Sequence, residues 1–176
     1  MHSALFLDRD GVINIDYGHV YKKENFDFIE NIFELVAYAK DIGHLVIVVT
    51  NQAGIAKGLY TEKDFCSLMS WVSNQFELNN GKIDKTYFCP YHVNGVIKEY
   101  IKDSIYRKPQ PGMILEACKE FNIDPNRSII VGDKKSDIEA GISSNIAKSI
   151  YFGSDSCEIA YKSVKNLSDI KKELIF

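Results

Sequence analysis

Two carboxylates near the start of the chain have the types and spacing needed for chemistry. Asp8 and Asp10 follow an apolar run, Ala4 to Leu7, and precede a glycine at position 11. The run predicts a strand buried on both faces, which can expose functional groups only at its carboxyl end, and ligands of open α/β sheets bind at that edge. Taken alone, two acids before a glycine also fit a tight turn with solvated side chains.

Further polar groups follow later apolar runs. The run His44 to Val49 ends in the polar segment Thr50 to Gln52, and the run Ser128 to Val131 leads into the segment Gly132 to Asp137. Two cations precede a proline in the segment Arg107 to Pro109. If the three strands are neighbours, an acid pair, a hydroxyl, a lysine and a second acid pair meet at one sheet edge.

These four motifs, in this order, resemble those of the haloacid dehalogenase-like (HAD) phosphatases, over nearly the whole chain. The resemblance implies a Rossmann-like, three-layer α/β sandwich with a central parallel sheet. It also favours a catalytic role for each motif over its plainer interpretation. Thr50 alone could cap the next turn, and Lys108 alone could be a solvated surface lysine.

The acids need a cation if they meet. Carboxylates as close as those of Asp8, Asp10 and Asp133 would be cannot all remain ionised without one. Oxygen ligands together with a substrate phosphate suit Mg²⁺. The resemblance assigns metal ligation to the Asp8 side chain, the Asp10 backbone carbonyl and the Asp133 side chain. Asp137 either ligates through water or caps the following helix.

Roles in phosphoryl transfer follow for the same residues. Asp8 is the expected nucleophile, forming an aspartyl-phosphate, because a cation shared with the phosphate removes much of their repulsion. Asp10 is expected to protonate the leaving oxygen and then to take a proton from the attacking water. Thr50, Asn51 and Lys108 are expected to donate to the phosphoryl oxygens, where charge spreads in the transition state.

Longer matches narrow the family. The strings LDRDGVIN, VVTNQAGIAKG, RKPQPGM and GDKKSD look like those of the D,D-heptose 1,7-bisphosphate phosphatases, which share this pattern with histidinol-phosphate phosphatases. The resemblance implies removal of the C7 phosphate of D-glycero-D-manno-heptose 1,7-bisphosphate. Histidinol phosphate or another small phosphomonoester is the alternative substrate, and a binding protein without turnover is the alternative class. The residues expected to bind or border the substrate are Asp16, Tyr17, Gly18, His19, Asn51, Gln52, Ala53, Arg107 and Lys134.

One segment departs from that family. Its members commonly hold a structural zinc with Cys-x-His after the third strand and Cys-x-Cys before the Arg-Lys-Pro motif. Cys89 is present here, but Tyr91, Ser104 and Tyr106 stand at the other three positions. A tetrahedral zinc site needs four ligands, and the neighbouring His92 could restore only one. We therefore expect no zinc, with Cys89 as a loop thiol and His92 as a solvated imidazole.

Hydrophobic periodicity predicts the scaffold. Apolar runs predict strands over residues 4–7, 44–49, 82–88, 128–131 and 149–152. Helical spacing predicts helices over residues 29–37, 61–76, 111–121 and 137–143. Thr61 and Asp64 have the spacing of a capping box at the second helix. Strands that alternate with helices imply a parallel sheet with right-handed crossovers.

Length, composition and charge narrow the class of protein. A chain of 176 residues with 45% hydrophobic residues predicts one domain, residues 1–176. Only about twenty residues separate Gly11 from the first long helix, room for a loop but not for a large cap domain. A net charge of −3 argues against nucleic-acid binding. The longest uncharged apolar run, Leu45 to Val49, is too short to span a membrane, so we expect a cytoplasmic protein. We also expect a monomer, and the resemblance implies a phosphorylated sugar as its substrate.

The C-terminal segment has a weaker pattern. Leu167, Ile170 and Leu174 predict a terminal amphipathic helix with Ser168 as its cap. Packing against the sheet is its expected use, and binding of a partner is the alternative.

Overall fold

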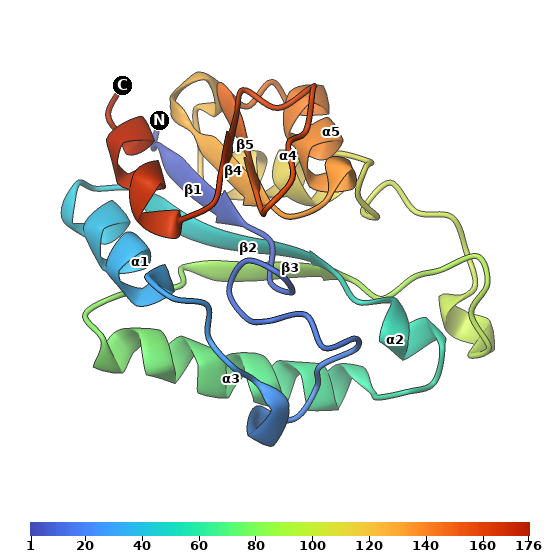
Figure 1. Cartoon of the computed structure of the whole chain (residues 1–176). Helices are drawn as coiled ribbons and strands as arrows, with labels where there is room; N and C mark the ends of the chain where they lie inside the picture. Colours follow the sequence, from blue (N-terminus) through green and yellow to red (C-terminus); the bar gives the residue numbers. More distant parts are fainter.

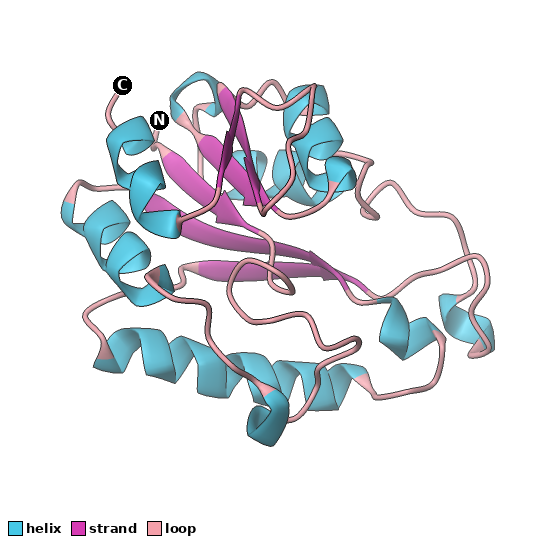
Figure 2. Cartoon of the chain, viewed as in Figure 1, coloured by secondary structure: helices cyan, strands magenta, loops and turns pink.

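A six-stranded parallel sheet forms the centre of the molecule. The computed structural model describes residues 1–176, and the strands lie in the order β3-β2-β1-β4-β5-β6 (Figures 1 and 2). The strands are β1 (Ala4–Leu7), β2 (Leu45–Asn51), β3 (Lys85–Cys89), β4 (Ile129–Gly132), β5 (Lys148–Phe152) and β6 (Lys162–Val164). The first, second and fourth strands are therefore neighbours, as the expected meeting of their polar ends requires.

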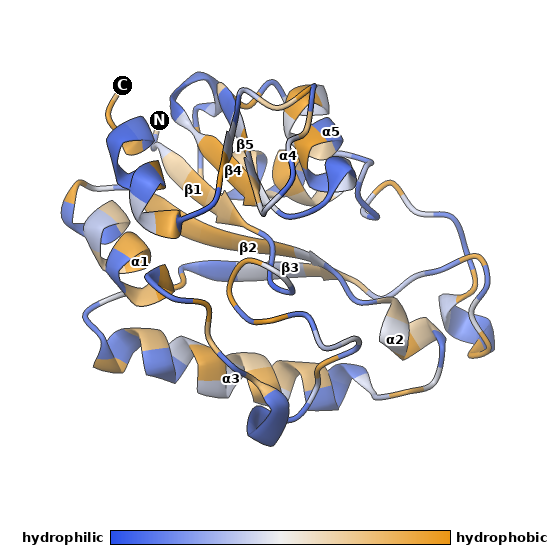
Figure 3. Ribbon diagram, in the orientation of Figure 1, coloured by the Kyte–Doolittle hydropathy of each residue, from blue (hydrophilic) through white to orange (hydrophobic).

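Alternation along β1 builds a core on each face of the sheet. Leu5 and Leu7 belong to the larger apolar cluster, whereas Ala4 and Phe6 belong to the smaller one, and all four side chains are fully buried. Parallel strands covered on both faces have such continuous apolar sequences. Figure 3 shows the resulting hydrophobic strands at the centre of the fold.

Helices cover both faces and complete three layers. Residues of α1, α3 and the C-terminal 3₁₀ helix line the larger cluster, and residues of α4 and α5 line the smaller one. The α-helices are α1 (Ile32–Asp41), α2 (Ala53–Ala56), α3 (Glu62–Leu78), α4 (Gly112–Glu120) and α5 (Lys135–Ser143). Between β1 and α1 lies a loop with one 3₁₀ turn, Lys23–Asn25, and no cap domain. The expected Rossmann-like α/β sandwich is confirmed.

The long helix α3 begins as its sequence predicts. The Thr61 hydroxyl accepts from the Asp64 amide at 3.1 Å, and the Asp64 carboxylate accepts from the Thr61 amide at 2.8 Å. This reciprocal capping box satisfies two backbone donors that the first helical turn leaves without partners. The predicted apolar stripe is buried along its length: Phe65, Leu68, Met69, Val72 and Phe76.

Three features differ from the sequence predictions. The strand β6 and the four-residue helix α2 were not predicted. The C-terminal helix is a 3₁₀ helix, Leu167–Leu174, and its cap is Asn166, whose side chain accepts from the Ser168 amide at 3.2 Å. The assignment of Ser168 as cap was therefore wrong by two residues, although Leu167, Ile170 and Leu174 are buried as expected.

None of the helices combines the length and apolar character that crossing a membrane requires.

Candidate active site

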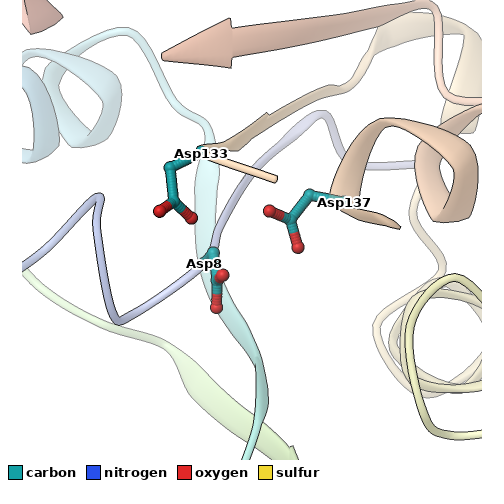
Figure 4. A group of neighbouring side chains, drawn as sticks. All are labelled: Asp8, Asp133 and Asp137. Carbon is teal, nitrogen blue, oxygen red and sulfur yellow. The ribbon is translucent and has the colours of Figure 1, made fainter. Parts of the chain in front are cut away.

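Three carboxylates meet at the carboxyl edge of the sheet (Figure 4). Asp8 follows β1, Asp133 follows β4, and Asp137 lies in the first turn of α5. One oxygen from each lies within 4.8 Å of the others. Asp8 and Asp137 also line a pocket of about 590 Å³, which is lined in addition by Asp10, Asp16, Gly18, His19, Asn51, Gln52, Ala53, Lys57, Tyr60, His92, Arg107, Lys108, Pro109, Lys134 and Ser136.

Two glycines allow this approach. A Cβ atom at Gly11 would lie 2.1 Å from a carboxylate oxygen of Asp133, and Gly11 has a φ of +92°, which favours glycine. A Cβ atom at Gly132 would lie 2.1 Å from the Cβ of Asp137. The turn after β1 and the end of β4 therefore need glycine for the carboxylates to converge.

A buried lysine stands between two of the acids. Lys108 Nζ lies 2.9 Å from Asp8 Oδ1 and 2.7 Å from Asp137 Oδ1, and it donates to the Val49 carbonyl at 2.7 Å. Asn51 holds the Lys108 backbone with two reciprocal hydrogen bonds of 3.0 Å. The Lys108 side chain is 1% exposed, so its interpretation as a solvated surface lysine is wrong.

The three clustered carboxylates outnumber the cations that pair with them. Burial raises the pKa of Asp8, with Lys108 opposing the shift and Asp137 adding to it. Burial alone would lower the pKa of Lys108, but Asp137 and Asp8 outweigh it and raise that pKa. One ammonium therefore serves two carboxylates, and the third, Asp133, lacks this partner.

Asp133 has the environment of a ligand for a cation. Its Oδ1 is buried and has no hydrogen-bond partner. Burial raises the pKa of Asp133 to about 7; Lys134 opposes this shift, whereas Asp8 and Asp137 add to it. A buried polar atom without a partner is costly, and a hard cation would satisfy this oxygen while offsetting the excess charge.

The raised pKa of Asp133 predicts a pH dependence of stability in the metal-free protein. Its folded pKa of about 7 exceeds the ordinary value of 3.8, so the folded state keeps a proton that the unfolded state has released. Stability is therefore lost as pH rises between these two values. Unfolding wild type and Asp133→Asn in EDTA from pH 4 to pH 7 should show wild type losing stability relative to the variant, and a constant difference would contradict the prediction.

Asp10 is held by three donors. Its Oδ1 accepts from Arg9 Nη2 at 2.6 Å and from Asn14 Nδ2 at 3.1 Å, and its Oδ2 accepts from Gln52 Nε2 at 3.1 Å. Gln52 Nε2 also donates to the Thr50 hydroxyl at 2.9 Å. Thr50 lies within β2 and caps no helix, so the capping interpretation of this residue is wrong.

Asp137 caps the following helix, which is one of the two roles expected for it, and it also pairs with Lys108, which was not expected. Its Oδ2 accepts from the Lys134 amide at 2.9 Å, which caps the start of α5, while its Oδ1 pairs with Lys108. Asp137 therefore caps α5 with one carboxylate oxygen and faces the site with the other.

The rim of the pocket includes most of the predicted substrate residues. An ion pair of 3.1 Å between Lys134 Nζ and Asp16 Oδ2 joins the N-terminus of α5 to the loop after β1, beside Gly18 and His19. Tyr17 is the exception. It is 58% exposed, donates to Asp27 Oδ2 at 2.8 Å and lies outside this pocket, because the turn at Gly18 and His19, both with positive φ, separates it from the rim.

Several pocket residues were missed by the sequence analysis. Lys57 follows α2, and Tyr60 donates to the Gln52 side chain. His92 was interpreted as a solvated imidazole, but it is half-buried in the pocket wall, and its Nδ1 accepts from the Asn94 amide at 3.0 Å. Partial burial and the cations Arg107 and Lys57 lower the pKa of His92. Lys57 is a cation close in sequence to the Thr50 to Gln52 segment, and this proximity is the signal that could have predicted its place in the pocket.

Side-chain and backbone contacts pack the segment after β3. Cys89 is the last residue of β3 and fully buried, so its interpretation as a loop thiol is wrong. The Tyr91 ring lies 3.7 Å from the ammonium of Lys102, and the Ser104 hydroxyl accepts from the Tyr106 amide at 3.2 Å. These contacts order the wall that carries His92.

Comparison of the sequence with known proteins finds relatives described as heptose-1,7-bisphosphate 7-phosphatases. A family model described as HAD-hydrolase-like matches residues 105–154. A D-glycero-alpha-D-manno-heptose-1,7-bisphosphate 7-phosphatase from Burkholderia mallei is 50% identical over 147 residues, which are 84% of this chain and 78% of that protein. Another of the same description, from Campylobacter jejuni, is 43% identical over 168 residues, 95% and 92% of the two chains. The D-glycero-beta-D-manno-heptose-1,7-bisphosphate 7-phosphatase of Haemophilus influenzae is 42% identical over 150 residues, 85% and 81% of the two chains.

Solved structures share the fold. A candidate HAD-like phosphatase from Mesorhizobium loti is 33% identical, with a TM-score of 0.90 over 98% of this chain and 86% of that one. A D,D-heptose 1,7-bisphosphate phosphatase from B. bronchiseptica, complexed with magnesium and phosphate, has a TM-score of 0.82 at 20% identity, over 98% of each chain.

Proposed function

The chain belongs to the D-glycero-D-manno-heptose-1,7-bisphosphate 7-phosphatase family of HAD-like hydrolases, and from that premise we propose that it releases the C7 phosphate of a heptose 1,7-bisphosphate. The observation that carries the proposal is the meeting of Asp8, Asp133 and Asp137 around a buried Lys108 at the carboxyl edge of the sheet. This arrangement provides a nucleophile, a cation site and a fixed positive charge in one pocket.

The residues fit Mg²⁺. Asp8, the Asp10 backbone carbonyl and Asp133 would hold it, which provides the hard oxygen donors that this ion prefers. The partnerless Asp133 oxygen supports this choice, as does the magnesium bound by the B. bronchiseptica relative. When bound, the ion supplies positive charge that offsets the repulsion between the Asp8 carboxylate and the phosphate. We assign Asp137 to the ion pair with Lys108 and to the cap of α5, and not to the metal.

The chain's own residues account for two half-reactions. The Asp8 carboxylate attacks phosphorus and the bond to the leaving oxygen breaks, while Asp10 gives that oxygen a proton. Asp10 then takes a proton from the water that hydrolyses the aspartyl-phosphate. Lys108 and the Thr50 hydroxyl donate to the phosphoryl oxygens, where preorganised charge stabilises the transition state. Both amide atoms of Asn51 are bonded to the Lys108 backbone, so its side chain acts by positioning Lys108.

The rim of the pocket suits a second anionic group. Arg107 and Lys134 line it, together with Lys57 and His92. A guanidinium can bind a phosphate with two parallel hydrogen bonds, which a single ammonium cannot. We assign Arg107 and Lys134 to the sugar and to its phosphate away from the reacting centre, with Gln52, Ala53, Asp16, Gly18 and His19 bordering the substrate.

The test is phosphate release from defined substrates. We expect Mg²⁺-dependent release from the heptose bisphosphate, with both C1 anomers assayed because the relatives are named for both. Histidinol phosphate has no second phosphate, so its kcat/KM should be lower by at least about tenfold for each charge-assisted hydrogen bond that it cannot form at the rim. Equal, weak rates on the bisphosphate and on histidinol phosphate would contradict the substrate assignment.

The segment between β3 and α4 is proposed to function without zinc. Tyr91, Ser104 and Tyr106 offer oxygen atoms where a tetrahedral structural site needs nitrogen or sulfur. Elemental analysis of protein purified without chelators should find well below one zinc per chain. One equivalent that stays through dialysis and disappears on Cys89→Ser would overturn this proposal.

A cytoplasmic location and a monomeric state stay predictions. Fractionation of the source cells tests the first, and light scattering of the purified protein tests the second.

A further inference from the structure

Arg9, between the two N-terminal acids, is one of the most deeply buried side chains of the protein. It is fully inaccessible to solvent. Its guanidinium carbon lies 5.9 Å from the centre of the Phe26 ring and 5.7 Å from that of Phe65. Both aromatic residues belong to the larger apolar cluster, as do Leu5 and Leu7. A cation therefore extends into a core that is otherwise apolar.

Stability alone does not account for this cation. Removing a charge from water costs several kcal/mol, and apolar residues of similar size often replace buried ions without loss of stability. Arg9 also leaves Nε and Nη1 buried without hydrogen-bond partners. An apolar side chain would satisfy the packing at this position, so the advantage of an arginine here lies in its polar contacts.

Both polar contacts of Arg9 come from one nitrogen. Nη2 donates to Asp10 Oδ1 at 2.6 Å and to the Val20 carbonyl at 2.5 Å. With Asn14 also donating to Oδ1, the Asp10 carboxylate is fixed so that Oδ2 lies beside the pocket residue Gln52. Val20 lies in the loop between β1 and α1, next to His19, which lines the pocket with Asp16 and Gly18. Arg9 thus links the orientation of Asp10 to the conformation of this loop.

We propose that Arg9 is a positioning residue, which aims Asp10 Oδ2 at the leaving oxygen and ties that orientation to the substrate loop. This inference rests on the proposed function, because it gives Asp10 the acid role. In that step the bond between phosphorus and the leaving oxygen breaks while the proton moves from Asp10 Oδ2 to that oxygen. Misplacing Oδ2 should therefore lower kcat/KM more for substrates whose leaving group needs the proton than for substrates whose leaving group does not.

The leaving group provides the test. An alkoxide such as that of a sugar needs a proton, whereas p-nitrophenolate leaves without one. For Arg9→Met we expect kcat/KM to fall by about 10²-fold on the heptose bisphosphate, in the range of general acid catalysis, and by less than tenfold on p-nitrophenyl phosphate. Arg9→Lys, which keeps the charge on a shorter side chain, should lose less than Arg9→Met on the bisphosphate.

Two further variants separate positioning from structure. Asp10→Asn should show the same dependence on the leaving group, and the double variant Arg9→Met/Asp10→Asn should be little worse than Asp10→Asn alone. Phe76→Leu is the matched control, since it removes packing from the same apolar cluster at a ring that pairs with Phe28 and Phe33, whereas the rings over the guanidinium are Phe26 and Phe65. Its losses should be equal on both substrates.

The outcomes are distinguishable. Equal losses on both substrates for Arg9→Met and Arg9→Lys, or additive losses in the double variant, would overturn the positioning role while leaving the phosphatase assignment intact. A wild-type protein that releases phosphate from neither substrate would instead contradict the proposed function.

Discussion

Asp8→Asn should yield a folded protein that no longer releases phosphate. The amide is a poor nucleophile, and Asp8 is the carboxylate that directly follows β1, pairs with Lys108 at 2.9 Å and lines the pocket. Loss of the nucleophile in a covalent mechanism should lower kcat on the order of 10⁴-fold or more. Phosphate release under saturating Mg²⁺ measures the loss, and circular dichroism with thermal unfolding verifies the fold.

A carboxylate outside the pocket provides the control. Asp27 accepts from the exposed Tyr17 hydroxyl, and Asp27→Asn makes the same chemical change away from the site. It should keep kcat/KM within about twofold of wild type, since surface substitutions have small effects. An active Asp8→Asn protein would contradict the covalent mechanism.

Lys108→Met should have the second largest effect, on stability and on activity together. It leaves two buried carboxylates, Asp8 and Asp137, without their cation, and breaking a buried pair in this way costs about 3–5 kcal/mol. Loss of one preorganised donor to the transition state should lower kcat/KM by about 10²- to 10³-fold. Thermal unfolding with EDTA and with Mg²⁺ should show a large drop in Tm that the metal partly reverses.

Lys134→Met is the matched comparison for stability. The Lys134 side chain is 53% exposed and pairs with Asp16 at the rim, where an ion pair contributes less than about 1 kcal/mol. Its free energy of unfolding should stay close to that of wild type. A Lys108→Met protein as stable as Lys134→Met would contradict the assigned role of the buried cation.

The parts of the fold that the sequence predicts are those with long apolar patterns. The runs before Asp8, Thr50 and Asp133 are continuous, apolar and short, which is typical of strands buried on both faces, and their parallel pairing places the polar ends together. The strand β6 has no such signal, because it is three residues long and begins with Lys162 and Ser163. Its identity depends on pairing with β5, which is a tertiary contact.

The candidate site shows a similar division. Motif order predicts which acids converge, but contacts between side chains depend on backbone turns that the sequence does not specify. The side-chain amide of Asn51 could donate a hydrogen bond to a phosphate, yet in the structure it bonds to the backbone of Lys108. Arg9 looks like a spacer between two acids, and only its burial and its bond to Val20 indicate another use. Asn166 and Ser168 are equally good caps by type, so the geometry decides between them.

The most direct test of the account is to trap the covalent intermediate. Acid quenching of the protein within its first turnover of the heptose bisphosphate, followed by peptide mass spectrometry, should find phosphate on Asp8 when Mg²⁺ is present and none when EDTA replaces it. Rapid turnover with no phosphate on Asp8 at any quench time, or with phosphate on another residue, would contradict the central claim that Asp8 attacks the phosphoester at this edge of the sheet.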